Sequence, residues 1–253
     1  NDKWITSITT HDENGNPIVR GYDLVELINK VNFTQAIFLV LKGELPTEKE
    51  EKLLNAILVA SIDHGVAAPS TTVARLTASN GVPSSTAIAN AIASIGEAHG
   101  GAAEALAKIL QENKDKTANT LVAEYKERGK RIPGYGHKIY EVDPRTQALL
   151  KTAQETGFWG EFVKKALEIE TELTKSYAAK GKKVPMNIDG AIAALMSELG
   201  FDYRLGKSLF IISRVAGIAA HVLEEQITAK PVRRISEADV EYTGPNKRSL
   251  PKP

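Results

Sequence analysis

The chain has 253 residues, of which 42% are hydrophobic and 25% charged, as is ordinary for a globular protein with a sizeable core. Lysine and arginine (32) nearly balance aspartate and glutamate (31), so no overall field favours nucleic acid or an anionic membrane, and we expect neither as a partner. The lack of cysteine excludes disulfides, thiol nucleophiles and cysteine-ligated metals, and the 5 histidines have no metal-ligand spacing, so we expect no metal site.

The N-terminal segment predicts a short β-hairpin, because Ile5, Ile8, Ile18 and Val19 flank a turn-forming stretch at 11–17. Beyond Tyr22, apolar residues recur at helical spacing, and glycine, proline or asparagine separates the segments. The fold class is therefore predicted to be all-α. The expected helices cover 24–31, 38–41 ending at Gly43, 47–62, 70–78, 84–95, 99–111, 117–128, 145–154, 161–179, 188–199 and 205–227.

Three features of the sequence concern its surroundings. The chain opens without a charged-then-apolar leader, and no run approaches about 18 apolar residues, so we expect a soluble protein that is not exported. Together with the lack of cysteine, this favours a cytoplasmic location. The alanine-rich stretches 87–93 and 102–107 suit close helix packing or a subunit seam.

The most informative stretch is Pro133-Gly134-Tyr135-Gly136-His137-Lys138-Ile139-Tyr140, followed by Asp143-Pro144-Arg145. Its glycines allow a tight turn close to a ligand, and it places an imidazole and a guanidinium in one loop. Imidazole transfers protons near neutral pH and guanidinium binds carboxylates, so the pair suits acid-base chemistry on an anionic substrate. A loop in which His137 only caps a helix and Arg145 faces solvent is the alternative.

Three other polar residues stand in patterns that admit two interpretations. His99, before Gly100-Gly101, is either a neutral hydrogen-bond donor at a helix start or an ordinary N-cap. Asp189, at the start of an apolar helix, is either an acid-base group or an N-cap. Arg214 lies on an apolar helix face and must find an anion there, either a ligand or a structural carboxylate. His221, farther along that helix, is interpreted as packing.

G-Y-G-H-x-x-Y followed by D-P-R resembles the signature of the citrate synthase superfamily, whose members make or break the bond between the acetyl group of acetyl-CoA and oxaloacetate. The H-G-G-A segment at 99–102, the N-I-D-G segment at 187–190 and the S-R-V-A-G segment at 213–217 resemble further family elements, in the family's order. The likeness runs from about residue 16 to 244. It implies a citrate-synthase-like helical fold of one compact unit over 1–253, with a large domain (1–137 with 205–253) and a small domain (138–204).

The resemblance also implies roles for individual residues. The catalytic residues would be His99, His137 and Asp189. Carboxylates of the substrate would be bound by His64, Arg145, Arg214 and Arg233. In the family the last role belongs to an arginine before a proline that reaches a neighbouring subunit. Lys230-Pro231 stands there in this chain, so Lys230, Arg233 and Arg234 remain alternatives. Coenzyme A would be bound by Pro133, Gly134, Tyr135, Gly136, Lys138, Lys182 and Lys183, although the lysine run at 180–183 also fits a solvated turn.

Two details point to one branch of the superfamily. D-H-G at 63–65 and N-I-D-G are closer to citryl-CoA lyases and the C-terminal module of ATP-citrate lyase than to citrate synthases, and a long helical stretch of full-length citrate synthases is missing between Thr47 and Asp63. The implied reaction is retro-aldol cleavage of citryl-CoA to acetyl-CoA and oxaloacetate, with coenzyme A as part of the substrate and no tightly bound cofactor. The alternatives are a citrate synthase and a non-catalytic protein that binds coenzyme A or a dicarboxylate. The resemblance implies a homo-oligomer of at least a dimer and a separate citryl-CoA synthetase as the source of the substrate.

Overall fold

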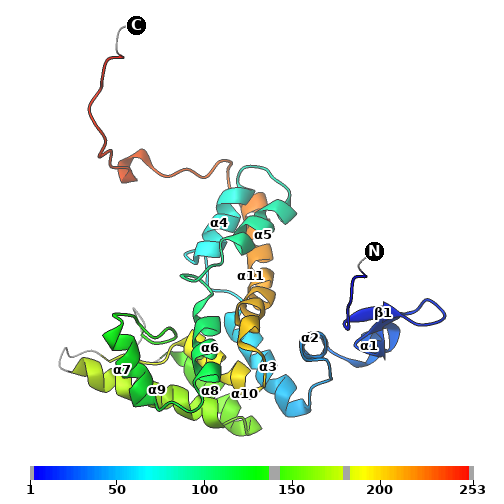
Figure 1. The fold of residues 1–253 in the computed structure, drawn as a ribbon. Helices are drawn as coiled ribbons and strands as arrows, with labels where there is room; N and C mark the ends of the chain where they lie inside the picture. Colours follow the sequence, from blue (N-terminus) through cyan, green and yellow to red (C-terminus); the bar gives the residue numbers. More distant parts are fainter. Residues whose placement is uncertain (1–2, 137–142, 179–182, 251–253) are drawn as a thin grey trace.

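The computed structural model describes residues 3–136, 143–178 and 183–250, and these form a helical body with a small N-terminal sheet (Figure 1). The all-α prediction is confirmed. The helices are α1 (Leu24–Lys30), α2 (Phe33–Lys42), α3 (Glu48–Ser61), α4 (Pro69–Ala78), α5 (Ser84–Ala93), α6 (Ala102–Glu112), α7 (Ala118–Glu127), α8 (Pro144–Thr156), α9 (Glu161–Tyr177), α10 (Ile188–Glu198) and α11 (Gly206–Thr228), with the 3-10 turns η2 (Tyr203–Leu205) and η3 (Glu237–Asp239).

The N-terminal sheet has one strand more than the predicted hairpin. Strands β1 (Thr9–His11), β2 (Pro17–Val19) and β3 (Tyr22–Asp23) pair antiparallel in that order. The third strand forms because Arg20 (φ 50°) and Gly21 (φ 87°) turn the chain back on itself. The Arg20 guanidinium then donates to the carbonyl of Val40, which ties the sheet to α2.

Several helix ends follow from local side-chain chemistry. Asn32 with Gln35, and Thr47 with Glu50, form capping boxes that start α2 and α3. The capping box at Asn32 starts α2 five residues before the predicted range at 38–41. Gly43, with φ 97°, ends this helix in the left-handed conformation.

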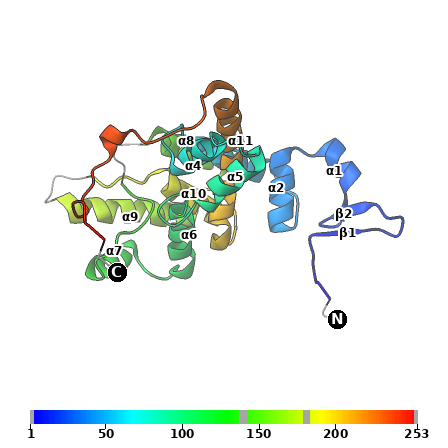
Figure 2. The same ribbon diagram turned by 90° about the horizontal axis from the view of Figure 1, so that it is seen from above.

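The main core lies between α3, α6, α7, α8, α9 and α10. Helix α10 is its centre, and residues from Gly190 to Ser197 are all buried. A second, smaller core joins α4, α5 and α11 through alanines and the side chains of Ile218 and Val222. The small alanine side chains let these three helices approach closely, as they do at one end of the body in Figures 1 and 2. In this arrangement α6 and α7 pack with α9 and α10, and the predicted division into two domains stays a prediction.

Helix α11 connects the two cores, since it contacts α3 and α6 on one side and α4 and α5 on the other. The segment Tyr203–Thr228 is long and apolar enough to pass a length-and-composition test for a membrane span. That test is also met by central helices of globular proteins. Here the helix packs against four others, and it carries the buried Arg214.

Two segments extend from the helical body. The N-terminal sheet and α1 lie to one side, next to α2, in both views (Figures 1 and 2). Beyond α11 the chain runs away from the end formed by α4, α5 and α11 (Figure 1), and its side chains Ile235, Val240 and Tyr242 are exposed.

Candidate active site

The start of α8 fixes the guanidinium of Arg145. The buried carboxylate of Asp143 caps the helix by accepting the backbone N–H of Arg145 (3.0 Å), and it accepts from Nε (3.1 Å) and Nη2 (2.9 Å) of the same residue. The third nitrogen, Nη1, lies 3.4 Å from Nδ1 of His64, in the turn between α3 and α4. Desolvation, Arg145 and Arg214 lower the pKa of His64. The exposed His64 imidazole is therefore neutral near pH 7 and lies beside a guanidinium.

Arg214 of α11 is buried, with 4% of its surface exposed. Its Nε donates to the carbonyl of Ser61 at the end of α3 (2.9 Å), and its guanidinium carbon lies 4.6 Å from the ring centre of Phe210. Burial lowers its pKa, and the more distant carboxylates of Asp63 and Asp189 act against this. Within the described ranges the guanidinium has no ion pair, so the structural carboxylate considered above is not found, and the charge remains available to an anionic ligand.

His99 lies in a tight turn in which Gly96 and His99 exchange backbone hydrogen bonds (3.0 and 3.2 Å). Its Nε2 accepts the backbone N–H of Ser70 (3.3 Å) and lies 2.9 Å from the Ser70 hydroxyl. An Nε2 that accepts a hydrogen bond carries no proton, so the proton of a neutral ring lies on Nδ1. Burial, Arg214 and His64 lower the pKa of His99, which favours this neutral form. The ring packs edge-on against Phe210 (5.8 Å).

The prediction that His99 starts the helix after it is wrong. Helix α6 begins at Ala102 and is capped by Gly101, so His99 lies outside its first turn and is not the N-cap. The helix end next to His99 is the start of α4. Gly101 is required in this turn because a Cβ there would lie 2.8 Å from the backbone of Gly96 and Glu97. The expected neutral imidazole therefore results from burial and nearby positive charge instead of from the dipole of α6.

Asp189 is the second residue of α10 and is not its cap. The cap is Asn187, whose Oδ1 accepts the backbone N–H groups of Asp189 (3.0 Å) and Gly190 (3.2 Å). Burial raises the pKa of the Asp189 carboxyl, although Arg145 and Arg214 oppose the shift. The side chain is therefore not needed for capping, and the carboxyl group holds a proton more firmly than an ordinary aspartate.

The loop at 133–136 is attached to the start of α10. Gly134 and Gly136 offer carbonyls to the backbone N–H (3.0 Å) and side-chain amide (3.1 Å) of Asn187, and the N–H of Gly136 donates to Pro185 (2.7 Å). Gly134, with φ 84°, and Gly190 leave no room for side chains, since a Cβ on Gly190 would lie 2.4 Å from the Gly134 carbonyl oxygen. The glycines of the motif therefore bring the loop against the helix that carries Asp189.

Not every predicted coenzyme A residue is placed toward a ligand. The hydroxyl of Tyr135 donates to the carbonyl of Ala166 in α9 (2.8 Å), and burial raises its pKa, so this side chain supports the loop from behind. Lys183 lies on the surface. The predicted residues His137, Lys138 and Lys182 lie outside the described part of the chain.

Arg233 lies apart from the other predicted substrate-binding residues. Its Nε and Nη2 donate to the buried carboxylate of Glu225 (2.5 and 2.8 Å), which also accepts from Arg75 of α4 (2.6 Å). Within its own chain, Arg233 thus holds the segment after α11 against α4 and α11. A contact with a neighbouring subunit's site, by Lys230, Arg233 or Arg234, stays a prediction.

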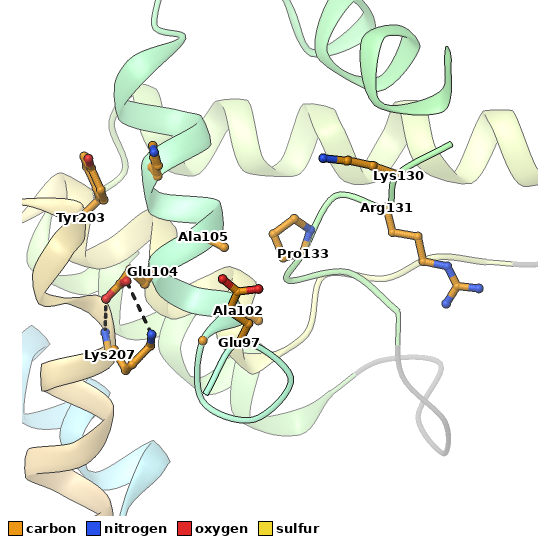
Figure 3. A pocket seen from close by; sticks show the side chains of 11 residues that line it. Glu97, Ala102, Glu104, Ala105, Lys130, Arg131, Pro133, Tyr203 and Lys207 are labelled. Atoms are coloured by element: carbon orange, nitrogen blue, oxygen red, sulfur yellow. Dashed lines mark hydrogen bonds and ion pairs between the residues drawn. The ribbon is translucent and has the colours of Figure 1, made fainter. Parts of the chain in front are cut away.

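A pocket of about 570 Å³ lies between the start of α6, the loop at 130–133 and the start of α11 (Figure 3). It is lined by Pro133 and by the residues after His99, and it contains four cationic side chains, Lys108, Lys130, Arg131 and Lys207. Lys207 pairs with Glu104 (3.8 Å), and Lys108 lies 5.6 Å from the ring centre of Tyr203. Figure 3 shows Lys130 and Pro133 on the side opposite α6. The pocket suits an elongated ligand with negative charge.

Five predicted residues from separate segments act on one another's charge. The pKa of Asp189 responds to Arg145, Arg214 and His64, and that of His99 responds to Arg214 and His64. The structure therefore gathers two cations, two neutral imidazoles and one carboxyl group of raised pKa. Such a set can bind carboxylates, donate a hydrogen bond to a developing oxyanion and transfer a proton to carbon.

Three site residues were missed from the sequence. Asp143 had a local signal, because an aspartate before Pro-Arg caps a helix and reaches the arginine two residues on. Phe210 had one also, since it stands one helical turn before Arg214. Ser70 had none, because its contact with His99 joins distant parts of the chain.

Comparison with known proteins identifies this arrangement. The profile of "Citrate synthase, C-terminal domain" matches residues 46–235. Citrate synthase 2 of Bacillus subtilis is 30% identical over 92% of this chain, and the chain spans 62% of that relative's length. A solved citryl-CoA lyase from Hydrogenobacter thermophilus has 47% identity and a TM-score of 0.91, covering 98% of this chain and 97% of the other. Citrate synthase from Thermoplasma acidophilum, in a ternary complex with carboxymethyl coenzyme A and oxaloacetate, has 26% identity and a TM-score of 0.72, covering 87% and 58%. The chain therefore belongs to the citrate synthase family.

Proposed function

We propose that the protein is a citryl-CoA lyase, which cleaves citryl-CoA to acetyl-CoA and oxaloacetate. The observation that carries this proposal is the cluster itself: two guanidinium groups, a neutral His99 with its proton on Nδ1, and Asp189 with a raised pKa. The 47% identity to a citryl-CoA lyase, over nearly the full length of both chains, supports the choice of reaction.

Arg145 and Arg214 bind carboxylates of the citryl group. Arg145 is held in place by Asp143, and Arg214 by the Ser61 carbonyl and the Phe210 ring, so both present their charge with little conformational freedom to lose. His64, beside Arg145, contacts the same end of the substrate. Because its imidazole is neutral, it can hydrogen-bond an oxygen there without adding a third positive charge.

Cleavage then follows a retro-aldol course. His137 accepts the proton of the tertiary hydroxyl, the bond to the CH₂ of the thioester arm breaks, and its electron pair moves into the enolate of acetyl-CoA. The N–H at Nδ1 of His99 stabilises the enolate oxygen, and Asp189 gives its proton to the enolate carbon. The products are oxaloacetate and acetyl-CoA, so atoms and charge balance without a redox cofactor or a metal.

The coenzyme A arm extends from His99 along the loop at 133–136 and into the pocket of Figure 3. Both the turn of His99 and Pro133 border that pocket, and its lysines and Arg131 suit the phosphates of coenzyme A. Lys138, Lys182 and Lys183 are further proposed contacts of the phosphates.

Citrate synthase activity is the second candidate, and the name of the Bacillus subtilis relative favours it. The same residues run in reverse join acetyl-CoA to oxaloacetate, and a synthase then also hydrolyses the thioester. A non-catalytic protein that binds coenzyme A or a dicarboxylate is the candidate of another class. The raised pKa of Asp189 argues against it, since binding alone gains nothing from a buried protonatable carboxyl group.

Two assays separate these candidates. Citryl-CoA is offered and oxaloacetate is measured, then acetyl-CoA with oxaloacetate is offered and free thiol is measured. A lyase yields oxaloacetate without thioester hydrolysis, whereas rapid thiol release with citrate formation indicates a synthase. The absence of turnover in both assays, with retained binding of coenzyme A, would leave the binding protein.

A further inference from the structure

The turn that carries His64 is fastened to helix α11 by four successive contacts. The Ser213 hydroxyl donates to the Leu58 carbonyl, and Nε of Arg214 donates to the Ser61 carbonyl (2.9 Å). One turn of helix later, Gly217 allows the turn to touch the helix directly, and His221 follows it on the same face.

Gly217 brings Asp63 and His221 together. A Cβ on Gly217 would lie 2.5 Å from the Ile62 carbonyl oxygen and 2.8 Å from Oδ1 of Asp63, so only glycine permits this approach. Oδ1 of Asp63 lies 3.2 Å from Nε2 of His221, while Oδ2 accepts the backbone N–H of Gly65 (2.9 Å). The two carboxylate oxygens thus connect α11 to the backbone on the far side of His64.

His221 has no other role that its contacts explain. Its Nδ1 is buried and has no hydrogen bond within the described part of the chain, and it lies 3.6 Å from Oε2 of Glu224, which pairs with Arg75 (3.1 Å). A side chain needed only for packing would be apolar here. A polar ring with one nitrogen on Asp63 and the other facing a carboxylate indicates that its direction matters.

We propose that Asp63 and His221 form a positioning pair that fixes His64 for substrate binding. The pair rests on the proposed function, because His64 acts on the citryl group only if the protein is a citryl-CoA lyase. Neither residue touches the substrate. They set the backbone at 63–65, and through it the distance between the His64 imidazole and Nη1 of Arg145. Misplacement of a binding group by about 1 Å costs on the order of 10²-fold in rate.

A double-mutant cycle tests the pair. His221→Leu removes the hydrogen bond to Asp63 and keeps most of the volume, and it is made in the wild type and in His64→Ala. We expect kcat/KM for citryl-CoA to fall about 10- to 100-fold in the wild-type background and less than about 3-fold in the His64→Ala background. His221→Gln, which restores a donor, should recover most of the activity. Equal losses in both backgrounds, or no loss from His221→Leu, would refute the positioning role.

Controls separate this inference from the function beneath it. His11→Gln, on the exposed strand β1, is the matched histidine change and should leave turnover unaltered. If the wild type and His11→Gln do not turn over citryl-CoA, the proposed function fails and the positioning role falls with it. If both turn it over and the cycle is additive, only the positioning role fails. Should His221→Leu not fold, Asp63→Asn replaces it in the same cycle with the same expected coupling.

Discussion

At the scale of single residues, the site is defined by charges that lack an ordinary partner. Arg214 is buried against a carbonyl and an aromatic ring, and Asp189 sits in surroundings that raise its pKa. Neither arrangement is favourable for the fold alone, because a buried charge is most stable beside an opposite charge. Both are explained if a carboxylate ligand neutralises Arg214 and a reaction uses the proton on Asp189.

Asp189→Asn should abolish turnover while it leaves the fold intact. Loss of the proton donor is expected to lower kcat about 10²- to 10⁴-fold. Because the folded pKa is raised, the stability that protonated Asp189 contributes is present at low pH and is lost as pH rises through that pKa. The melting temperature of Asp189→Asn should therefore gain on the wild type from pH 5 to pH 8. A melting difference that shrinks with rising pH, or turnover within about 3-fold of wild type, would contradict this assignment.

At the scale of elements, the sequence predicted most helices because capping boxes, glycine stops and apolar spacing act locally. The start of α3 at Thr47 and the end of α2 at Gly43 are examples. Tertiary contacts could not be predicted in the same way. The partner of His99 is Ser70 at the start of α4, and the partner of Arg233 is Glu225, and both pairings depend on how the helices pack. Motif residues were found because their order matched a family, but the direction of their side chains required coordinates.

Gly190→Ala tests the junction between the 133–136 loop and α10. In most helices alanine is more favourable than glycine by up to about 1 kcal/mol. Here the new Cβ would lie 2.4 Å from the Gly134 carbonyl oxygen, so we expect destabilisation by about 1–3 kcal/mol and a large loss of turnover. Gly96→Ala, whose Cβ would meet nothing within 4 Å, serves as the control for stability in chemical denaturation. A stabilised Gly190→Ala protein would show that the loop does not contact α10 as described.

At the scale of the whole molecule, a chain of charges joins the site to the segment after α11. It runs from Asp63 through His221 and Glu224 to Arg75, and Glu225 then joins Arg75 to Arg233. Glu225 is the buried member, and the Arg233 hydrogen bond is the largest cause that lowers its pKa. The network therefore anchors the C-terminal segment by a carboxylate that must be ionised.

Glu225→Gln should release that anchor. Because the folded pKa is lowered, the stability from Glu225 is present above the ordinary glutamate value of 4.5 and is lost as pH falls through the folded pKa. We expect Glu225→Gln to lose about 3 kcal/mol at pH 7. The difference from wild type should disappear in acid, as followed by denaturant titrations between pH 7 and pH 3. A difference that is independent of pH would exclude an ionised anchor.

The exposed side chains of Leu76, Leu223 and Ile227 make one end of α4 and α11 apolar, and we propose that a second copy of the chain covers it. Light scattering should give at least twice the mass of one chain. Leu223→Glu with Ile227→Glu should reduce that mass, whereas Val25→Glu on α1, at the other side of the molecule, should not. A monomeric wild type would refute the proposal.

The cleavage of citryl-CoA in D₂O tests the central claim most directly, with both products identified by mass spectrometry. If Asp189 delivers a solvent-derived proton to the enolate carbon, the products are oxaloacetate and acetyl-CoA with one deuterium in its methyl group. Citrate and free coenzyme A, with no oxaloacetate, would contradict the account.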